Sequence, residues 1–185
     1  MDLTWESLEE RCKNCKACSL SETRTNVVFG AGNRNAKLMF IGEAPGETED
    51  LSGIPFVGRA GKLFDKFLVA VDIPRESVYI ANMLKCRPPK NRDPKPEEQD
   101  LCIEYLNAQI KIIKPALIVC LGRISAMRLI KPDFKITKEH GIWFDKGNYK
   151  ICAVYHPSLL LRDPRRKEDM LIDMQAVKKE LDSIS

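Results

Sequence analysis

The chain has 185 residues, a length that favours one compact domain with a sizeable core, so we expect a single domain over residues 1–185. Its composition is 44% hydrophobic and 30% charged, which excludes a disordered tail or a fibrous repeat. The 30 Lys and Arg residues against 26 Asp and Glu residues give a formal charge of +4. This excess is too small to indicate a binding partner until the positions of the charges are known.

The sequence shows no candidate membrane span. Its longest apolar run, residues 116–121, is far shorter than the roughly 20 residues that cross a bilayer. The amino-terminal residues MDLTWESLEE lack the basic and apolar regions of a signal peptide. We therefore expect a cytoplasmic protein in which the seven cysteines are reduced and act as metal ligands or buried thiols.

Short apolar segments alternate with helical patterns along the chain. The apolar segments predict buried strands at residues 37–42, 77–81, 116–122 and 150–155. The helical patterns cover residues 61–71, 96–114, 124–129 and about 165–181. This alternation predicts an α/β fold: a three-layer α/β/α sandwich around a central, mainly parallel four-stranded sheet. Ligands of such sheets bind beyond the carboxyl ends of the strands.

Two cysteine pairs have the spacing of metal ligands. The first is a Cys-x2-Cys pair and the second a Cys-x15-Cys pair, formed by Cys15, Cys18, Cys86 and Cys102. Four thiolates bind zinc or a 4Fe-4S cluster, and the spacing does not distinguish these from a chance arrangement. Cys12 forms a second Cys-x2-Cys pair with Cys15, so either pair is a candidate. Cys120 and Cys152 lie within predicted strands and are expected to pack in the core.

The loop after the first predicted strand is acidic and rich in glycine. Residues 42–50 read GEAPGETED and contain four acidic side chains, which indicates either a ligand site or an ordinary surface turn. The continuation IPFVGRAG, residues 54–61, places Phe56 and Arg59 in the same connection. Packing alone does not call for these two side chains in a loop, and the glycines allow the backbone to approach a ligand.

Two later loops are basic. Residues 82–95 carry five cations, one acid and three prolines, which suits contacts to phosphate or a solubilising surface. Residues 156–162, HPSLLLR, follow the last strand and precede a further basic run. His156 therefore shares the ligand edge with Asn82 and the acidic loop, whereas His140 has the features of a structural histidine. Adjacent leucines in a loop indicate a binding surface or a wedge.

Five motifs in this order resemble the family 4 uracil-DNA glycosylases: CKACSL with the following RT and VFGAG, then GEAPGETED, PFVGRAG, NMLKCRPPKNRDP and HPSLLLR. The resemblance covers about residues 15–162. It implies a three-layer α/β/α fold and a 4Fe-4S cluster. Because base excision requires no electrons, we expect the cluster to be structural, with redox sensing as the alternative. By this resemblance the cluster ligands are Cys15, Cys18, Cys86 and Cys102, and Cys12 falls outside the pattern.

The same resemblance implies roles in a pocket for a flipped base. It assigns Asn82 to O4 and N3–H of uracil, Phe56 to stacking on the ring and His156 to O2, where negative charge develops. It suggests Glu49 for excluding the methyl group of thymine. The first motif contributes Glu43, Ala44 and Pro45 to the substrate pocket.

One step of the implied chemistry stays open. Related families use an Asp to position the attacking water, and this chain has Ala44 at that position. The candidates that replace it are Glu43 and Asn91. Alternatively, stabilisation of the leaving group is sufficient. We count both residues, with His156, as candidate catalytic groups.

The basic loops are the expected DNA contacts. The cations would bind phosphates, and a leucine or Arg162 would fill the gap left by the flipped base. This set comprises Lys85, Arg87, Lys90, Arg92, Leu160, Leu161, Arg162, Arg165 and Arg166. The excess positive charge of the chain lies in these two loops.

The resemblance therefore implies a monofunctional DNA repair enzyme. It would hydrolyse the glycosidic bond of uracil in single- or double-stranded DNA and leave an abasic site. We expect a monomer without membrane contact, located at the nucleoid when bound to DNA and able to meet replication or repair proteins. The alternatives are a non-catalytic iron-sulfur or zinc nucleic-acid-binding module, and a glycosylase with broader specificity for deaminated bases.

Overall fold

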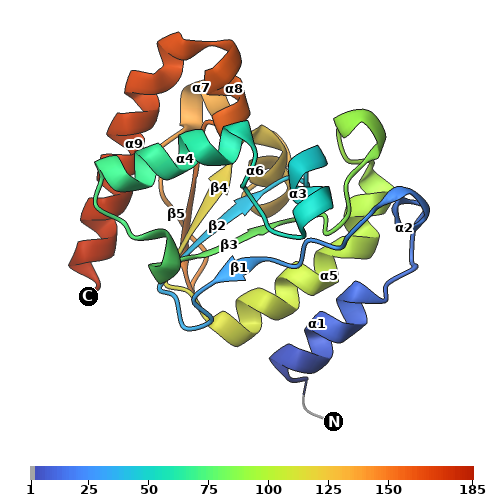
Figure 1. The fold of residues 1–185 in the computed structure, drawn as a ribbon. Helices are drawn as coiled ribbons and strands as arrows, with labels where there is room; N and C mark the ends of the chain where they lie inside the picture. The colour runs from blue at the N-terminus through green and yellow to red at the C-terminus, as the bar shows by residue number, and fades with distance from the viewer. Residues whose placement is uncertain (1–2) are drawn as a thin grey trace.

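The computed structural model of the chain describes residues 3–185, and its centre is a six-stranded sheet of order β1-β3-β2-β4-β6-β5 (Figure 1). The strands are β1 (Ala31–Gly32), β2 (Leu38–Gly42), β3 (Tyr79–Asn82), β4 (Leu117–Leu121), β5 (Phe144–Asp145) and β6 (Lys150–Val154). The four central strands are parallel, and β1 and β5 pair antiparallel at the edges. The four predicted parallel strands are confirmed. The sheet is wider than predicted because two edge strands of two residues each are too short to give a sequence pattern.

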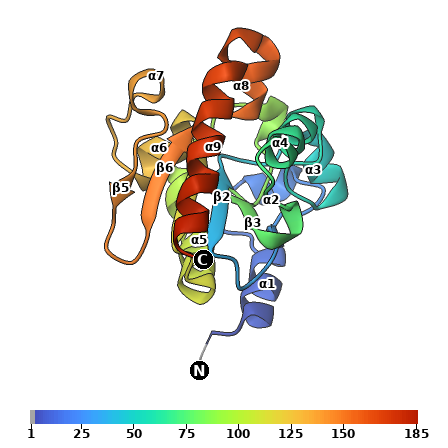
Figure 2. The ribbon, with the colours of Figure 1, turned by 90° about the vertical axis from the view of Figure 1, so that its left-hand side faces the viewer.

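The helices form a layer on each face of the sheet (Figures 1 and 2). One layer contains α1 (Trp5–Lys13), α5 (Pro96–Ile113) and α6 (Arg123–Leu129), and the other contains α4 (Arg59–Ala70), α8 (Pro157–Arg162) and α9 (Lys167–Ser183). Shorter elements are α2 (Leu20–Thr23), α3 (Glu47–Ser52), α7 (Ile136–Glu139) and the 3-10 turns η1 (Arg75–Ser77), η2 (Pro89–Asn91) and η3 (Pro164–Arg166). The expected three-layer α/β/α architecture is present.

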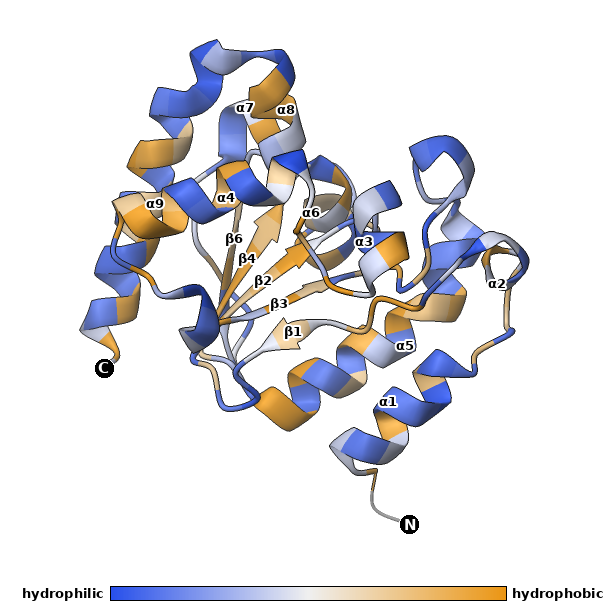
Figure 3. Cartoon of the chain, viewed as in Figure 1, coloured by the Kyte–Doolittle hydropathy of each residue, from blue (hydrophilic) through white to orange (hydrophobic). Residues whose placement is uncertain are grey.

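Each face of the sheet has its own apolar core. Along β2, Leu38 and Phe40 pack against α4 and α9, whereas Met39 and Ile41 pack against α1 and α5. This alternation follows from the twofold side-chain period of a strand. Figure 3 shows mainly apolar central strands and surrounding helices in which hydrophilic and apolar residues alternate. Cys120 and Cys152, 0% and 1% exposed, pack in these cores as expected.

Two helix boundaries differ from the sequence expectation for identifiable reasons. Helix α4 begins two residues early, at Arg59, because Gly58 is its N-cap. Helix α9 begins at Lys167 because the preceding residues form the turn η3. Within residues 3–185, no helix is both long and apolar enough to span a membrane.

His140 has the structural environment that its position predicts. Its Nδ1 lies 2.6 Å from Oδ2 of Asp173 on α9, and its ring lies 4.8 Å from the ring of Tyr155, between centroids. These contacts tie the segment after α7 to the outer helix layer.

The register of the parallel strands determines where the site forms. Gly42 at the end of β2 lies opposite Asn82 at the end of β3. The loops that follow these strands therefore start side by side, and the loop after β6 leaves from the same edge.

Candidate functional site

A cleft of about 620 Å³ lies beyond the carboxyl ends of β2, β3 and β6, a size typical of small-molecule pockets. Every residue predicted to be catalytic or to bind substrate lines this cleft: Glu43, Ala44, Pro45, Glu49, Phe56, Asn82, Asn91 and His156. Three connections that are far apart in the sequence, those after β2, β3 and β6, thus converge on one cavity.

Asn82 is the best-defined polar group in the cleft. The residue is 2% exposed, and its Oδ1 is the only buried side-chain nitrogen or oxygen of the described residues without a hydrogen-bond partner. Gly42 allows this arrangement, because a Cβ there would lie 2.4 Å from Oδ1. A buried carbonyl without a donor costs about 1–3 kcal/mol, so Oδ1 is free to accept a hydrogen bond from a donor on a ligand.

His156 presents a hydrogen-bond donor to the cleft. Its Nδ1 accepts the backbone N–H of Ser158 over 3.0 Å and lies 2.7 Å from Oγ of the same serine. A backbone N–H only donates, so Nδ1 carries no proton and the neutral ring is protonated at Nε2. Burial among the surrounding groups, assisted by Arg162, lowers the pKa of His156 to about 4, which keeps the ring neutral near pH 7.

Phe56 forms an aromatic wall beside this histidine. The two ring centroids are 5.7 Å apart, and Phe56 is 6% exposed. Its ring also faces Phe64 of α4, with 5.8 Å between centroids. An aromatic face next to an amide and an imidazole suits a planar polar ring.

Glu43 has a free carboxylate at the edge of the cleft. No hydrogen bond to this carboxylate is found among the described residues, and burial together with the nearby charge of Asp93 raises its pKa. The other candidate for water positioning, Asn91, already accepts a 2.7 Å hydrogen bond at Oδ1 from Nε of Arg87. Of the two, Glu43 alone has side-chain oxygens that accept no hydrogen bond from the described residues, whereas Asn91 Oδ1 already accepts one.

Both carboxylate oxygens of Glu49 accept hydrogen bonds from the backbone. Its Oε1 accepts from the N–H of Gly46 at 3.1 Å. Its Oε2 accepts from Val57 and Gly58 at 3.1 and 2.7 Å. This carboxylate therefore joins the N-caps of α3 and α4, a role that the sequence did not indicate.

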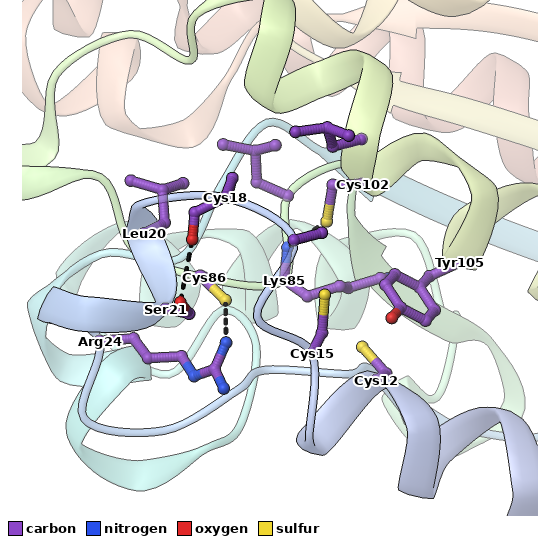
Figure 4. A pocket seen from close by; sticks show the side chains of 13 residues that line it. Cys12, Cys15, Cys18, Leu20, Ser21, Arg24, Lys85, Cys86, Cys102 and Tyr105 are labelled. Carbon is purple, nitrogen blue, oxygen red and sulfur yellow. Dashed lines mark hydrogen bonds between the residues drawn. The ribbon is translucent and has the colours of Figure 1, made fainter.

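A second cavity contains the predicted metal ligands. Cys15, Cys18, Cys86 and Cys102 all line it, together with the buried Cys12 (Figure 4). Cys12 lies on α1, which is capped by Thr4 and packs its buried face against α5. The structure thus brings the four predicted ligands together and adds a fifth thiol that the spacing left undecided.

The sequence is similar to that of known proteins over most of its length. The sequence profile of the uracil-DNA glycosylase superfamily matches residues 29–177. The chain belongs to this superfamily. It is 43% identical to the Type-4 uracil-DNA glycosylase of Archaeoglobus fulgidus, over 93% of this chain and 92% of that protein.

Two further relatives of the same type extend this similarity. The Type-4 enzyme of Thermotoga maritima is 49% identical over 85% of this chain and 83% of its own length. That of Sulfurisphaera tokodaii is 40% identical over 94% and 83%.

Three of the thiols in this cavity have a raised pKa. Burial raises the pKa of Cys12 to about 12 and that of Cys102 to about 11. Burial also raises the pKa of Cys86, although the neighbouring Arg24 opposes this shift. Arg24 donates to Sγ of Cys86 at 3.2 Å, and the N–H of Lys85 donates to Sγ of Cys102 at 3.3 Å.

No carboxylate side chain of the described residues lines the cysteine cavity, whereas Arg24 and Lys85 do. Nor is any group of three or more Cys, His, Asp or Glu side chains in residues 3–185 arranged to hold a metal ion.

Two predicted DNA contacts are wrong. Lys85 is 1% exposed, because its ammonium is buried and donates to the carbonyl of Phe29 at 3.0 Å and to Oε1 of Gln109 at 2.7 Å. Leu160 is 0% exposed and belongs to the core beneath α8. Neither side chain reaches the surface of this superfamily member.

The remaining basic set lies at the surface to different degrees. Arg92 forms two 2.8 Å bonds to the carboxylate of Glu98, which neutralises much of its charge. Leu161, 37% exposed, and Arg162 both line the cleft. Exposed or half-buried positions are also held by Arg87, Lys90, Arg165 and Arg166.

Sequence reasoning missed one cation. Arg123 lines a third cavity of about 320 Å³, which shares Glu43, His156 and Arg162 with the cleft. Its Nη2 lies 3.3 Å from Oδ2 of Asp93. Nothing in the LGRISA segment distinguishes this arginine from an ordinary surface residue.

Proposed function

We propose that the chain is a monofunctional uracil-DNA glycosylase that removes uracil from DNA and leaves an abasic site. The buried, unpartnered Oδ1 of Asn82 is the observation that carries this proposal. The N3–H of uracil is a donor of the required kind, and the amide nitrogen of the same side chain is then available for O4. Cytosine, with an acceptor at N3 and a donor at C4, opposes this pattern.

Phe56 and His156 complete the binding of the flipped base. The aromatic ring offers a stacking face, and the Nε2–H of the histidine is available for O2. As the bond between C1′ and N1 breaks, its electron pair moves onto the base and negative charge appears at O2. A preorganised donor at such a position contributes about 3–4 kcal/mol to the transition state.

Glu43 is the group that we assign to the attacking water. The water oxygen bonds to C1′ of the sugar, and a water proton passes to the carboxylate. The uracil anion then takes up a proton from solvent. The carboxylate of Glu43 accepts no hydrogen bond from the described residues, whereas the amide oxygen of Asn91 already accepts one from Arg87, and this difference supports the choice of Glu43.

The proposed DNA surface surrounds the cleft. Exposed cations on the loops after β3 and β6 bind phosphates, and Leu161 together with Arg162 fills the space of the flipped base. We retain Glu49 as the residue that excludes thymine, because it lines the same cleft.

The second cavity suits a 4Fe-4S cluster. Its donors are thiols, and the two cations at its wall complement the negative charge of a thiolate-bound cluster. Cys15, Cys18, Cys86 and Cys102 would hold it, and it would link the amino-terminal segment to the loop after β3. A single zinc ion, which four thiolates also bind, is the alternative occupant.

A uracil-containing oligonucleotide tests the proposed function. The protein is incubated with single- and double-stranded substrate, and alkali then cleaves any abasic site. We expect strand breaks at uracil with the native chain and none at thymine. The exposed Asn148 provides a control variant, Asn148→Ala, which should cleave like the native protein. Uncut strands would instead favour a non-catalytic nucleic-acid-binding module.

A further inference from the structure

Phe56 has an unusual backbone conformation for an aromatic residue. Its φ angle is 51°, in the left-handed region. The other non-glycine residues with positive φ in residues 3–185 are all polar or charged: Asp72, Lys90, Asn91 and Lys114. A bulky side chain adopts this conformation only when its surroundings hold it there.

Arg75 holds the carbonyl side of this residue. Its Nη1 donates to the carbonyl oxygen of Phe56 at 2.8 Å, and its Nη2 donates to that of Pro55 at 2.6 Å. Asp65 of α4 fixes the guanidinium through a 2.6 Å contact to Nη1. The planar guanidinium thus grips two successive carbonyls, which a lysine cannot do.

Glu49 holds the amide side. Its Oε2 accepts from the N–H groups of Val57 and Gly58, the two residues that follow Phe56. The backbone is therefore fixed before and after the left-handed residue by two side chains from different elements.

Two glycines leave space for this arrangement. A Cβ on Gly61 would lie 2.0 Å from the carbonyl oxygen of Phe56, and one on Gly42 would lie 2.6 Å from Cζ of its ring. Because Gly42 is also the neighbour of Asn82 Oδ1, the ring position and the amide that reads the base depend on the same strand end.

We propose that Arg75, oriented by Asp65, and Glu49 are positioning residues that hold Phe56 in its left-handed conformation and so fix its ring in the cleft before the base arrives. This inference rests on the proposed function. Relaxation of Phe56 to negative φ would redirect its Cβ and move the ring away from Asn82 and His156. A preformed stacking wall lowers the ordering cost of binding the flipped base.

A double-mutant cycle tests the inference in the full-length protein. Arg75→Met removes both carbonyl contacts, and we expect kcat/KM on a uracil oligonucleotide to fall at least about tenfold. In the Phe56→Ala background, where no ring needs positioning, the same substitution should change kcat/KM less than about twofold.

Thermal unfolding distinguishes positioning from general stability. If Arg75 only stabilised the fold, Arg75→Met would lower Tm by the same amount in both backgrounds. It would also lower kcat/KM by the same factor in both. Arg128→Met is the matched control, because Arg128 forms a comparable ion pair with Asp100 at 2.7 Å on the opposite helix layer, and it should leave kcat/KM unchanged. Asp65→Asn, which loosens the guanidinium without removing it, is used if Arg75→Met does not fold, and it should show the same dependence on the Phe56 ring.

Each outcome has a separate meaning. An inactive native protein would refute the proposed function. With an active native protein, an Arg75→Met effect that persists undiminished in the Phe56→Ala background, or no effect in the native background, would overturn the inference.

Discussion

The backbone N–H of Ser158 donates to Nδ1 of His156 over 3.0 Å, and this bond determines which nitrogen of the imidazole faces the cleft. Because Nδ1 is an acceptor, the neutral ring carries its proton on Nε2. Protonation of Nδ1 would break this bond and place a second positive charge near Arg162. The loop after β6 thus holds His156 as a neutral donor rather than as an imidazolium.

The pH profile should reflect this neutral histidine. The pKa of His156 is lowered from 6.5 to about 4, so the folded protein keeps the ring neutral while the unfolded chain protonates it below about pH 6.5. Stability is therefore lost as pH falls from about 6.5 to about 4, and activity should show no inflection near 6.5. A kcat/KM profile of Glu43→Gln, which removes the other titrating group, checks this. A clear inflection between pH 6 and 7 would contradict it.

Glu43 should account for the loss of activity of the native protein at acidic pH. Burial and Asp93 raise its pKa above the usual value of 4.5, so the active carboxylate form is lost as pH falls through this raised pKa. Glu43→Gln should lower kcat by roughly 10²–10³ and remove this pH dependence. The exposed Glu10 supplies a control, Glu10→Gln. A native-like rate in Glu43→Gln would show that leaving-group stabilisation is sufficient without this group.

The parallel strands were predictable because they are continuous apolar runs. Their carboxyl ends then indicated the edge of the sheet at which the cleft lies. The segment HPSLLLR shows where sequence reasoning stops. Its leucines suggested an exposed loop, but the structure forms α8, whose period turns Leu160 into the core and Leu161 outward.

Lys85 is a second case of this limit. A lysine in a basic motif predicts a surface position, and its burial depends on Gln109 and the carbonyl of Phe29, 24 and 56 residues away. Arg75 likewise lies in no motif, and only the tertiary structure shows its contacts with Pro55 and Phe56. Long-range partners of single polar groups have no local sequence signal.

The burial of Lys85 predicts a difference between two lysines in DNA binding. Lys90→Ala should weaken binding uniformly across sequences and reduce the slope of log K against log salt by about 0.7–0.9, the loss of one phosphate contact. Lys85→Met should leave that slope unchanged, because its ammonium does not reach the surface. Salt titrations followed by fluorescence anisotropy measure both slopes. A reduced slope in Lys85→Met would contradict its assignment to the interior.

The cysteine cavity predicts which thiols retain an iron-sulfur cluster. Each serine substitution of a predicted ligand should remove the brown colour and the bound iron. Each should also lower Tm, because the amino-terminal segment loses its anchor. The four variants are Cys15→Ser, Cys18→Ser, Cys86→Ser and Cys102→Ser. Cys120→Ser is a control for substitution of a buried core thiol, and it should keep the colour. Iron analysis and visible absorption of protein prepared without oxygen make the comparison. A colourless native protein containing zinc would refute the cluster assignment.

The most direct test of the account concerns Asn82, whose buried Oδ1 has no partner within the described residues. Single-turnover cleavage of a uracil oligonucleotide by Asn82→Ala should be slowed by at least about 10³-fold, in line with the loss of a base-reading polar group, while affinity for an undamaged oligonucleotide stays within about threefold of native. Native-like cleavage by this variant, or an equal loss of cleavage and of binding to undamaged DNA, would contradict the assignment of Asn82 as the residue that reads uracil.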